Sequence, residues 1–266
     1  MLAALMLPLA ADPGHAADTG CPEAPAPSSS KGIAVADVLD GATVRLQDGR
    51  TVRLAGLLPP LAPLSLAPGA PWPPEAAARG ALLDLLSDRA VRLQDLSAAP
   101  DRHGRHSGRL YGADDTWIGG ALVDAGTLIV APEGGGACRA RLLALEDGAR
   151  RAGRGVWAVP SPLFGRAEDG ELRQRAGRYM VVEGRVRSVG AGRRVTFLNF
   201  GDDWSKDFTV LLYSSGSGRG GSATADRKSL AGARIRVRGW LESRGGALIR
   251  VNSPDGIERL DPASGS

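Results

Sequence analysis

The chain has 266 residues, enough for two domains, and its 43% hydrophobic and 23% charged residues are ordinary for a soluble globular protein. No segment is long and apolar enough to span a bilayer as a helix, which argues against an integral membrane protein of that kind. The net charge of +4 is uneven, because residues 171–262 contain 17 basic and 10 acidic residues. A basic C-terminal part favours a polyanion as a partner.

Residues 1–17 have the pattern of a signal peptide. Leu2–Leu9 is an apolar run too short to cross a bilayer, and the small residues around Ala16 suit cleavage. We therefore expect an exported protein, periplasmic or secreted. Residues 18–31, rich in Pro, Ala and Ser, would form a flexible lead to the first domain.

The chain contains only two cysteines, Cys21 and Cys138. In an oxidising compartment an even pair is a disulfide candidate. The bond would join the start of the mature chain to the last helix of the first domain. Two unpaired thiols, one of them buried, are the alternative.

Residues 40–61 contain two predicted strands joined by a tight turn. Thr43–Leu46 leads into the pair Asp48-Gly49, and Val52–Leu57 leads out of it. An Asp-Gly pair between alternating apolar residues predicts a β-hairpin, because glycine adopts the positive φ that the turn needs.

Further elements are predicted around this hairpin. Dense prolines exclude helix and regular strand pairing, whereas apolar residues at helical spacing predict helices. In chain order we expect a Pro-rich loop over Pro59–Pro74, a helix over Glu75–Leu86, a strand over Val91–Leu93, a polar loop over Asp101–Arg109 and a closing helix over Arg139–Arg154.

A second domain is predicted over residues 177–262, after a linker at 159–176. Runs of β-branched and aromatic residues separated by turn residues predict five short strands, which suggests a small OB-like barrel. The runs are Tyr179–Val189, Val195–Phe200, Phe208–Tyr213, Arg234–Leu241 and Leu248–Val251.

Arginines alternate with apolar residues along these runs. The alternation would place Arg185, Arg187, Arg236 and Arg238 on one face, away from the core. A basic face beside aromatic side chains suits single-stranded nucleic acid, through phosphate attraction and base stacking. The aromatic candidates are Phe197, Phe200, Trp204 and Trp240. Alternatively, the aromatic residues belong to the core and the arginines only solvate the surface.

Three landmarks occur in order over residues 32–158. They are Asp40–Val44 with Val52–Leu57, then Asp101–Arg105, and finally Gly155–Trp157. In order and spacing, this half of the chain resembles a staphylococcal nuclease-like domain of the thermonuclease family. The resemblance implies an OB-like five-stranded barrel with helices. The expected fold is thus mainly β (α+β), with a second small OB-like barrel behind the first.

Active members of that family cut phosphodiester bonds with Ca²⁺, a carboxylate base and two arginines. The resemblance places the phosphate-contacting arginines at Arg53 and Arg105. It places the two metal ligands at Ala42 and Leu58 and the base at Leu61. Because neither Ala nor Leu binds Ca²⁺ or accepts a proton, we expect hydrolysis to be lost and no metal or cofactor to be bound.

Three hypotheses follow. The first is an exported nuclease-like protein that binds single-stranded nucleic acid or another polyanion without cutting it. The second is an active Ca²⁺-dependent phosphodiesterase whose site is rebuilt from other carboxylates, of which the candidates are Asp40, Glu75, Asp101 and Asp114. The third is an interaction module for proteins of the cell envelope, in which Arg53 and Arg105 are only surface charge.

Overall fold

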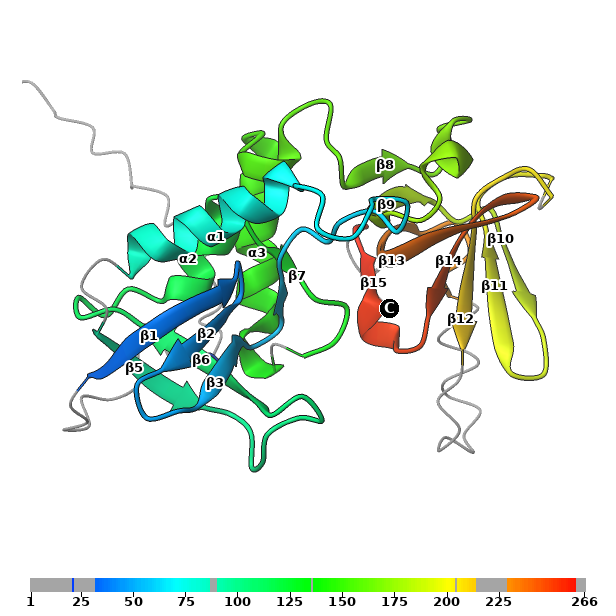
Figure 1. Cartoon of the computed structure of the whole chain (residues 1–266). Coiled ribbons are helices and arrows are strands. Elements are labelled where there is room, and N and C mark those ends of the chain that lie inside the picture. Colours follow the sequence, from blue (N-terminus) through cyan, green and yellow to red (C-terminus); the bar gives the residue numbers. More distant parts are fainter. Residues whose placement is uncertain are drawn as a thin grey trace, which may run out of the picture.

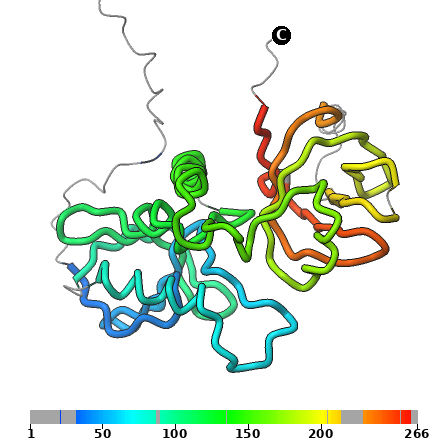
Figure 2. Tube along the Cα trace, turned by 90° about the horizontal axis from the view of Figure 1, so that it is seen from above, coloured from blue at the N-terminus to red at the C-terminus, as the bar shows by residue number. Residues whose placement is uncertain are grey.

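The computed structural model describes residues 21, 32–86, 90–134, 136–203, 205–213 and 229–261. These residues are mainly β, and their strands form two bodies that lie side by side (Figures 1 and 2). The expected signal peptide and lead, apart from Cys21, lie outside the described residues, as does Trp204. No helix in the described ranges has the length and apolar character that a membrane crossing requires.

Five strands of the first body close into a barrel in the order β1-β2-β3-β6-β5. All neighbours are antiparallel except β3 and β6, which are parallel. The strands are β1 (Ile33–Asp40), β2 (Thr43–Leu46), β3 (Thr51–Leu54), β5 (Ala90–Asp95) and β6 (Arg105–Tyr111). The predicted hairpin is present as β2 and β3. Gly49 adopts a φ of 90° at its turn, and Val44, Leu46, Val52 and Leu54 are buried.

Three helices cover this barrel: α1 (Pro73–Leu85), α2 (Ile118–Asp124) and α3 (Arg139–Arg151). α1 begins at proline, whose fixed φ suits a first helical turn, and it buries Ala78 and Leu82. The predicted helices over Glu75–Leu86 and Arg139–Arg154 therefore exist with slightly different ends. The predicted polar loop is shorter than expected, because β6 already begins at Arg105. A short separate pair, β4 (Leu57–Leu58) and β7 (Ile129–Val130), extends from the barrel.

The second body is one sheet in the order β10-β11-β12-β14-β13-β9-β8, with β15 also paired to β13. β12 and β14 are parallel. The strands are β8 (Phe164–Arg166), β9 (Tyr179–Arg185), β10 (Ser188–Ala191), β11 (Val195–Asn199), β12 (Thr209–Tyr213), β13 (Arg234–Arg244), β14 (Gly246–Val251) and β15 (Ile257–Arg259). All five predicted strands are found, the first of them divided into β9 and β10. The segment expected as a linker contains β8, which pairs with β9.

A third apolar cluster joins the two bodies. Its buried members are Ile129, Ala149, Val156, Trp157, Leu163, Tyr179 and Val181, and Leu58, Leu61, Phe164 and Trp240 pack against them. The cluster therefore takes side chains from both bodies and from the chain segment that leads from α3 into β8. Figure 2 shows this segment running between the two bodies. The two bodies therefore share a buried apolar contact.

The expected disulfide is confirmed. Cys21 and Cys138 are bonded, with their Cα atoms 4.5 Å apart and a sequence separation of 117. Cys138 ends the short 3₁₀ turn η1 (Gly136–Cys138), directly before α3. The bond therefore fixes the N-terminal segment to the helix that also contacts the second body.

We expect loss of this bond to destabilise the protein. Replacing both residues, Cys21→Ala with Cys138→Ala, should lower the free energy of unfolding by about 2–4 kcal/mol, because the cross-link restricts a long loop in the unfolded chain. Urea unfolding of the oxidised wild type and the double variant measures the difference. Added reductant should shift the midpoint of the wild type and leave that of the variant unchanged. Equal midpoints for both proteins without reductant would contradict the prediction.

Candidate functional site

Arg53 and Arg105 lie on neighbouring parallel strands. In the register of β3 and β6, Thr51 is opposite Arg105 and Arg53 is opposite Ser107. Because side chains alternate along a strand, Arg53 and Arg105 point to the same side of the sheet. Both line a pocket of about 320 Å³, whose wall is completed by Leu54, Gly56, Leu57, Ser97, Ala99, Asp101, His106, Ser107, Ala131, Glu133 and Gly134. The structure thus brings together the two arginines that the sequence predicts.

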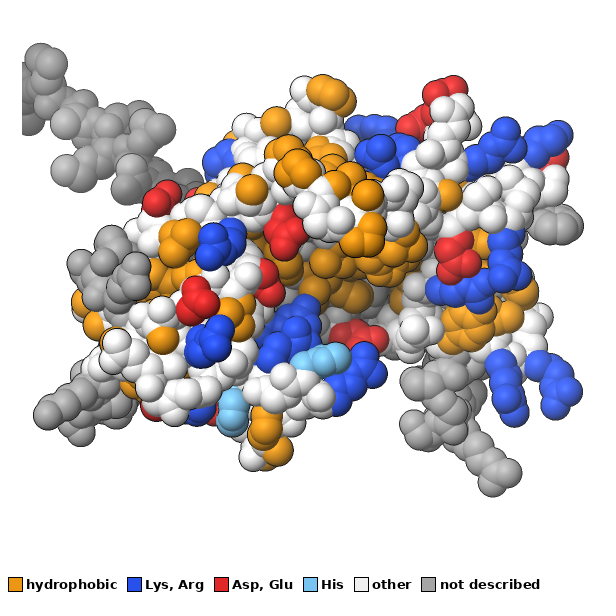
Figure 3. Space-filling model, in the orientation of Figure 1, with side chains coloured by type: hydrophobic (Ala, Val, Ile, Leu, Met, Phe, Trp, Pro, Cys, Tyr) orange, Lys and Arg blue, Asp and Glu red, His pale blue; other side chains and the backbone are white. Residues whose placement is uncertain are grey.

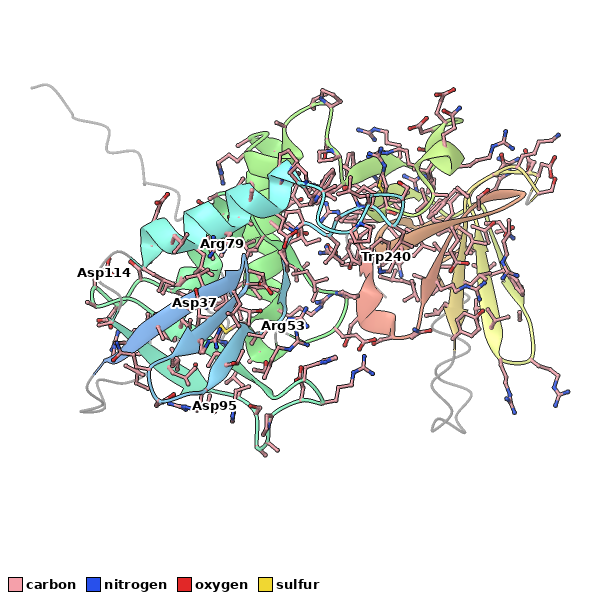
Figure 4. The ribbon with its side chains drawn as sticks, in the orientation of Figure 1. Asp37, Arg53, Arg79, Asp95, Asp114 and Trp240 are labelled. Atoms are coloured by element: carbon pink, nitrogen blue, oxygen red, sulfur yellow. A yellow bond between two sulfur atoms is a disulfide. The ribbon has the colours of Figure 1, made fainter. Side chains whose placement is uncertain are left out.

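The pocket lies where the first body faces the second. Figure 4 shows Arg53 on that side of the barrel, while Asp95 and Asp114 lie away from it. Figure 3 shows Lys or Arg, His and acidic side chains gathered near the middle of the visible face, below a band of apolar surface. The pocket is therefore open to solvent and borders the junction of the two bodies.

Arg53 is half-buried and has no ion-pair or hydrogen-bond partner among the described residues. Burial lowers the pKa of its guanidinium, and the nearby charge of Arg105 lowers it further, while Asp40 and Asp101 act in the opposite direction. An arginine remains charged under such conditions. Arg53 therefore holds a positive charge that no contacting carboxylate neutralises, and an anion in the pocket would neutralise it.

Arg105 is held by the loop that precedes it. Its Nε and Nη2 donate to Asp101 Oδ2 at 3.0 and 2.9 Å, and its backbone N–H donates to Asp101 Oδ1 at 3.0 Å. Gly104 adopts a φ of 74°, which lets the loop turn back on Asp101. These contacts fix the guanidinium at the pocket wall.

The carboxylates proposed for a rebuilt active site do not meet there. Of Asp40, Glu75, Asp101 and Asp114, only Asp101 lines the pocket. Its hydrogen bonds from the Arg105 backbone and guanidinium hold the pKa of Asp101 well below its usual range, and such a carboxylate is a weak general base. Among the described residues no group of three or more His, Cys, Asp or Glu side chains could hold a metal ion.

Glu133 and His106 also line the pocket, and the sequence did not predict them there. Glu133 belongs to a Pro/Gly-rich loop 80 residues after Arg53. Only the pairing of β4 with β7 brings that loop to the site. His106 Nδ1 lies 3.1 Å from Asp95 Oδ2 and is held on the barrel surface by this contact. No local sequence signal indicates the placement of Glu133, whereas His106 directly follows Arg105 in the sequence.

Ala42, Leu58 and Leu61 occupy the positions that the resemblance assigns to carboxylates. Ala42 is 0% exposed and belongs to the core of the first barrel. Leu58 and Leu61 pack against the apolar cluster between the two bodies. All three side chains therefore make packing contacts, and two of them help to join the bodies.

The expected exposure of Arg236 and Arg238 is wrong. Alternation along β13 does direct them away from the barrel core, but α3 of the first body covers that face. Arg238 Nη2 lies 2.8 Å from Glu146 Oε2, and Arg238 Nη1 donates to the carbonyl oxygen of Val130 at 2.6 Å. Burial lowers the pKa of Arg238, but Glu146 and Glu258 raise it by more. This side chain is a structural ion at the junction and is unavailable to a ligand.

Arg236 completes the same network. It contacts Glu183 Oε1 at 2.9 Å, Glu258 Oε2 at 2.9 Å and Asp147 Oδ1 at 3.0 Å. Arg150 of α3 also pairs with Glu183, at 2.6 Å. Burial raises the pKa of Glu183, whereas Arg150 and Arg236 lower it by more, so the net direction is down. Asp147 and Arg150 belong to α3, so the Arg236–Asp147 and Arg150–Glu183 ion pairs connect the two bodies. The Arg238–Glu146 ion pair does the same.

Arg185 and Arg187 do lie at the surface, as expected. Arg185 Nη1 donates to the carbonyl oxygen of Gly232 at 2.6 Å, and Arg187 pairs with Asp202. Of the aromatic candidates in the described ranges, Phe200 and Trp240 pack against apolar clusters, and only Phe197 is exposed. The continuous basic and aromatic face predicted from the sequence is therefore absent from the described part of the second body.

Comparison with known proteins adds no family to this picture: neither the family models nor the curated proteins that were searched match the chain.

Proposed function

We propose that this is an exported, nuclease-like binding protein that grips a phosphate-bearing polyanion without cutting it, with single-stranded nucleic acid as the first candidate ligand. The observation that carries the proposal is Arg53, a half-buried arginine that contacts no carboxylate among the described residues, in a pocket that also holds Arg105. Guanidinium groups bind phosphate through paired, charge-assisted hydrogen bonds. Two of them on one side of a sheet suit successive oxygens of a phosphodiester.

The strand order supports an OB-like description of both bodies. In the first, the third strand of the barrel, β3, runs parallel to β6, and in the second, β12 runs parallel to β14. If β9 and β10 count as one bent strand, five strands of each body can be numbered in chain order. In both bodies these five strands are then arranged as 1-2-3-5-4-1, with strands 3 and 5 parallel. OB-like barrels commonly bind oligonucleotides and oligosaccharides.

The absence of catalysis is proposed from the side chains present. A phosphodiesterase of the kind that the chain resembles needs carboxylates for a hard cation and for proton removal. Ala42, Leu58 and Leu61 supply packing instead. The disulfide supports export, because such bonds persist mainly in oxidising compartments.

The deciding experiment pairs binding with cleavage. Purified full-length protein is titrated into a labelled single-stranded oligonucleotide between 50 and about 200 mM salt, and the same samples are assayed for cleavage with and without Ca²⁺. Binding that weakens steeply with salt and is not followed by cleavage supports the proposal. Ca²⁺-dependent cleavage would establish the phosphodiesterase instead. Absence of both would leave an envelope-interaction module.

Arg53→Ala should weaken oligonucleotide binding about tenfold, because one charge-assisted contact to phosphate is lost. The slope of log affinity against log salt should also become shallower. The matched control is Arg45→Ala, which removes an exposed arginine on the neighbouring strand that makes a long 3.4 Å ion pair with Asp37. Equal effects of the two variants would mean that binding depends on overall charge and that the pocket is not the site.

A further inference from the structure

The second body carries a separate pocket, on the outer face of β11, β12 and β14. Its volume is about 510 Å³, and it is lined by Gly190, Phe197, Asn199, Thr209, Leu211, Arg244, Gly246, Ala247 and Leu248. The strand registers explain this composition. Asn199, Thr209 and Leu248 form one row across the three strands, and Phe197 and Leu211 belong to the next row on the same face. Leu198 and Val210 point to the opposite side, into the core.

The wall of this pocket is apolar, with few polar groups. Phe197 is 37% exposed, an unusual state for a large apolar side chain on an otherwise polar surface. Figure 3 shows an apolar patch over this part of the second body, bordered by Lys or Arg side chains. A pocket of this size, mostly apolar with a few convergent polar groups, is typical of small-molecule sites.

Thr209 contributes to the shape of the wall and offers no hydrogen bond to a ligand. The residue is 9% exposed, and its hydroxyl oxygen is buried without a hydrogen-bond partner. An oxygen atom that water cannot touch is equally out of reach of a ligand in the pocket, so the polar contact must come from another residue of the wall.

Arg244 supplies the charge. It lies at the exposed end of β13, next to the tight turn at Gly245, and it has no ion-pair or hydrogen-bond partner among the described residues. The other arginine of this face, Arg250, is already paired with Glu242 at 2.7 Å and with the Tyr213 hydroxyl at 2.7 Å. The pocket therefore offers one free cation beside a large apolar wall, which suits one negative charge better than a row of phosphates.

We propose that this pocket binds a small amphipathic carboxylate, with its apolar body against Phe197, Leu211 and Leu248 and its carboxylate at the Arg244 guanidinium. The site is distinct from the Arg53 pocket, because it lies on the second body and on different strands. It does not depend on the proposed polyanion binding.

The test uses 1-anilinonaphthalene-8-sulfonate, an aromatic monoanion that fluoresces in apolar surroundings, with the full-length protein. We expect saturable binding of the probe and its displacement by decanoate, but not by 1-decanol at the same concentration. Decanol that displaces the probe as well as decanoate does would overturn the assignment of a carboxylate site.

Variants locate the site. Arg244→Gln should weaken decanoate binding about tenfold, and Phe197→Ala should abolish displacement, because each removes one half of the proposed contact. The matched control is Arg259→Gln, an exposed arginine on β15 that should leave binding unchanged. If Arg244→Gln and Arg259→Gln bind decanoate equally, the proposal fails.

Discussion

Replacing Arg238 with methionine should lower the free energy of unfolding by about 3–5 kcal/mol, because it leaves Glu146 charged and buried without its partner. Both side chains of this pair are 0% exposed. Methionine is similar in length to the arginine stem, so the loss reflects the unpaired charge more than an empty space. Arg238 also donates to Val130, and that carbonyl oxygen loses this donor.

Urea unfolding followed by tryptophan fluorescence measures the effect where it arises, since Trp157 and Trp240 both belong to the cluster between the bodies. Arg187→Met is the control. It breaks an exposed ion pair with Asp202 and should cost less than about 1 kcal/mol. If Arg238→Met also costs less than about 1 kcal/mol, the network does not hold the bodies together.

A second substitution tests the cause. Glu146 Oε1 also accepts the backbone N–H of Val130 at 2.7 Å. Glu146→Gln removes the charge and retains an acceptor for that N–H. The pair Arg238→Met with Glu146→Gln should therefore be more stable than Arg238→Met alone. A double variant that is less stable than Arg238→Met alone would show that the unpaired charge of Glu146 does not cause the loss of unfolding free energy.

Local sequence patterns were sufficient for most of the elements. The Asp48-Gly49 turn, the prolines that begin α1 and the five β-rich runs after residue 177 each depend on neighbours in sequence, and each element is present. The Cys21–Cys138 bond was also predictable, because only one pairing is possible. The family resemblance singled out Arg53 and Arg105, but whether they meet was known only from the register of β3 with β6 and the pocket that both residues line.

The junction between the bodies was not predictable from the same patterns. Alternation correctly placed Arg236 and Arg238 on the outer face of β13, but it gives no information on what covers that face. Their partners Glu146 and Asp147 lie about ninety residues away on α3, where the sequence reads as an ordinary charged helix surface. Arg244 was not predicted to share a pocket with Phe197, because the pairing of β11, β12 and β14 forms the wall on which both residues lie.

Introducing carboxylates at Ala42, Leu58 and Leu61 should damage the fold and produce no nuclease activity. Ala42→Asp alone should cost about 3 kcal/mol or more, because Ala42 is fully buried in the barrel core and its N–H already donates to Asp40 Oδ1 at 2.7 Å. A second carboxylate at that point would be buried beside a like charge. Ala36→Asp, at an exposed position of β1, is the matched control and should be nearly neutral.

Leu58→Asp and Leu61→Glu test whether these two positions serve the contact between the two bodies. Both leucines pack against the cluster that contains Tyr179 and Val181 of the second body, so charges there must be desolvated or must separate the bodies. We expect the triple variant to unfold at lower urea concentration, to gain no stability from added Ca²⁺ and to cleave no oligonucleotide. Stabilisation by Ca²⁺ with cleavage would show that the metal site is still formed and lacks only its ligands. The expected outcome would mean that these three changes alone do not create a metal site, because Ala42 packs in the core of the first body and the two leucines pack at its junction with the second.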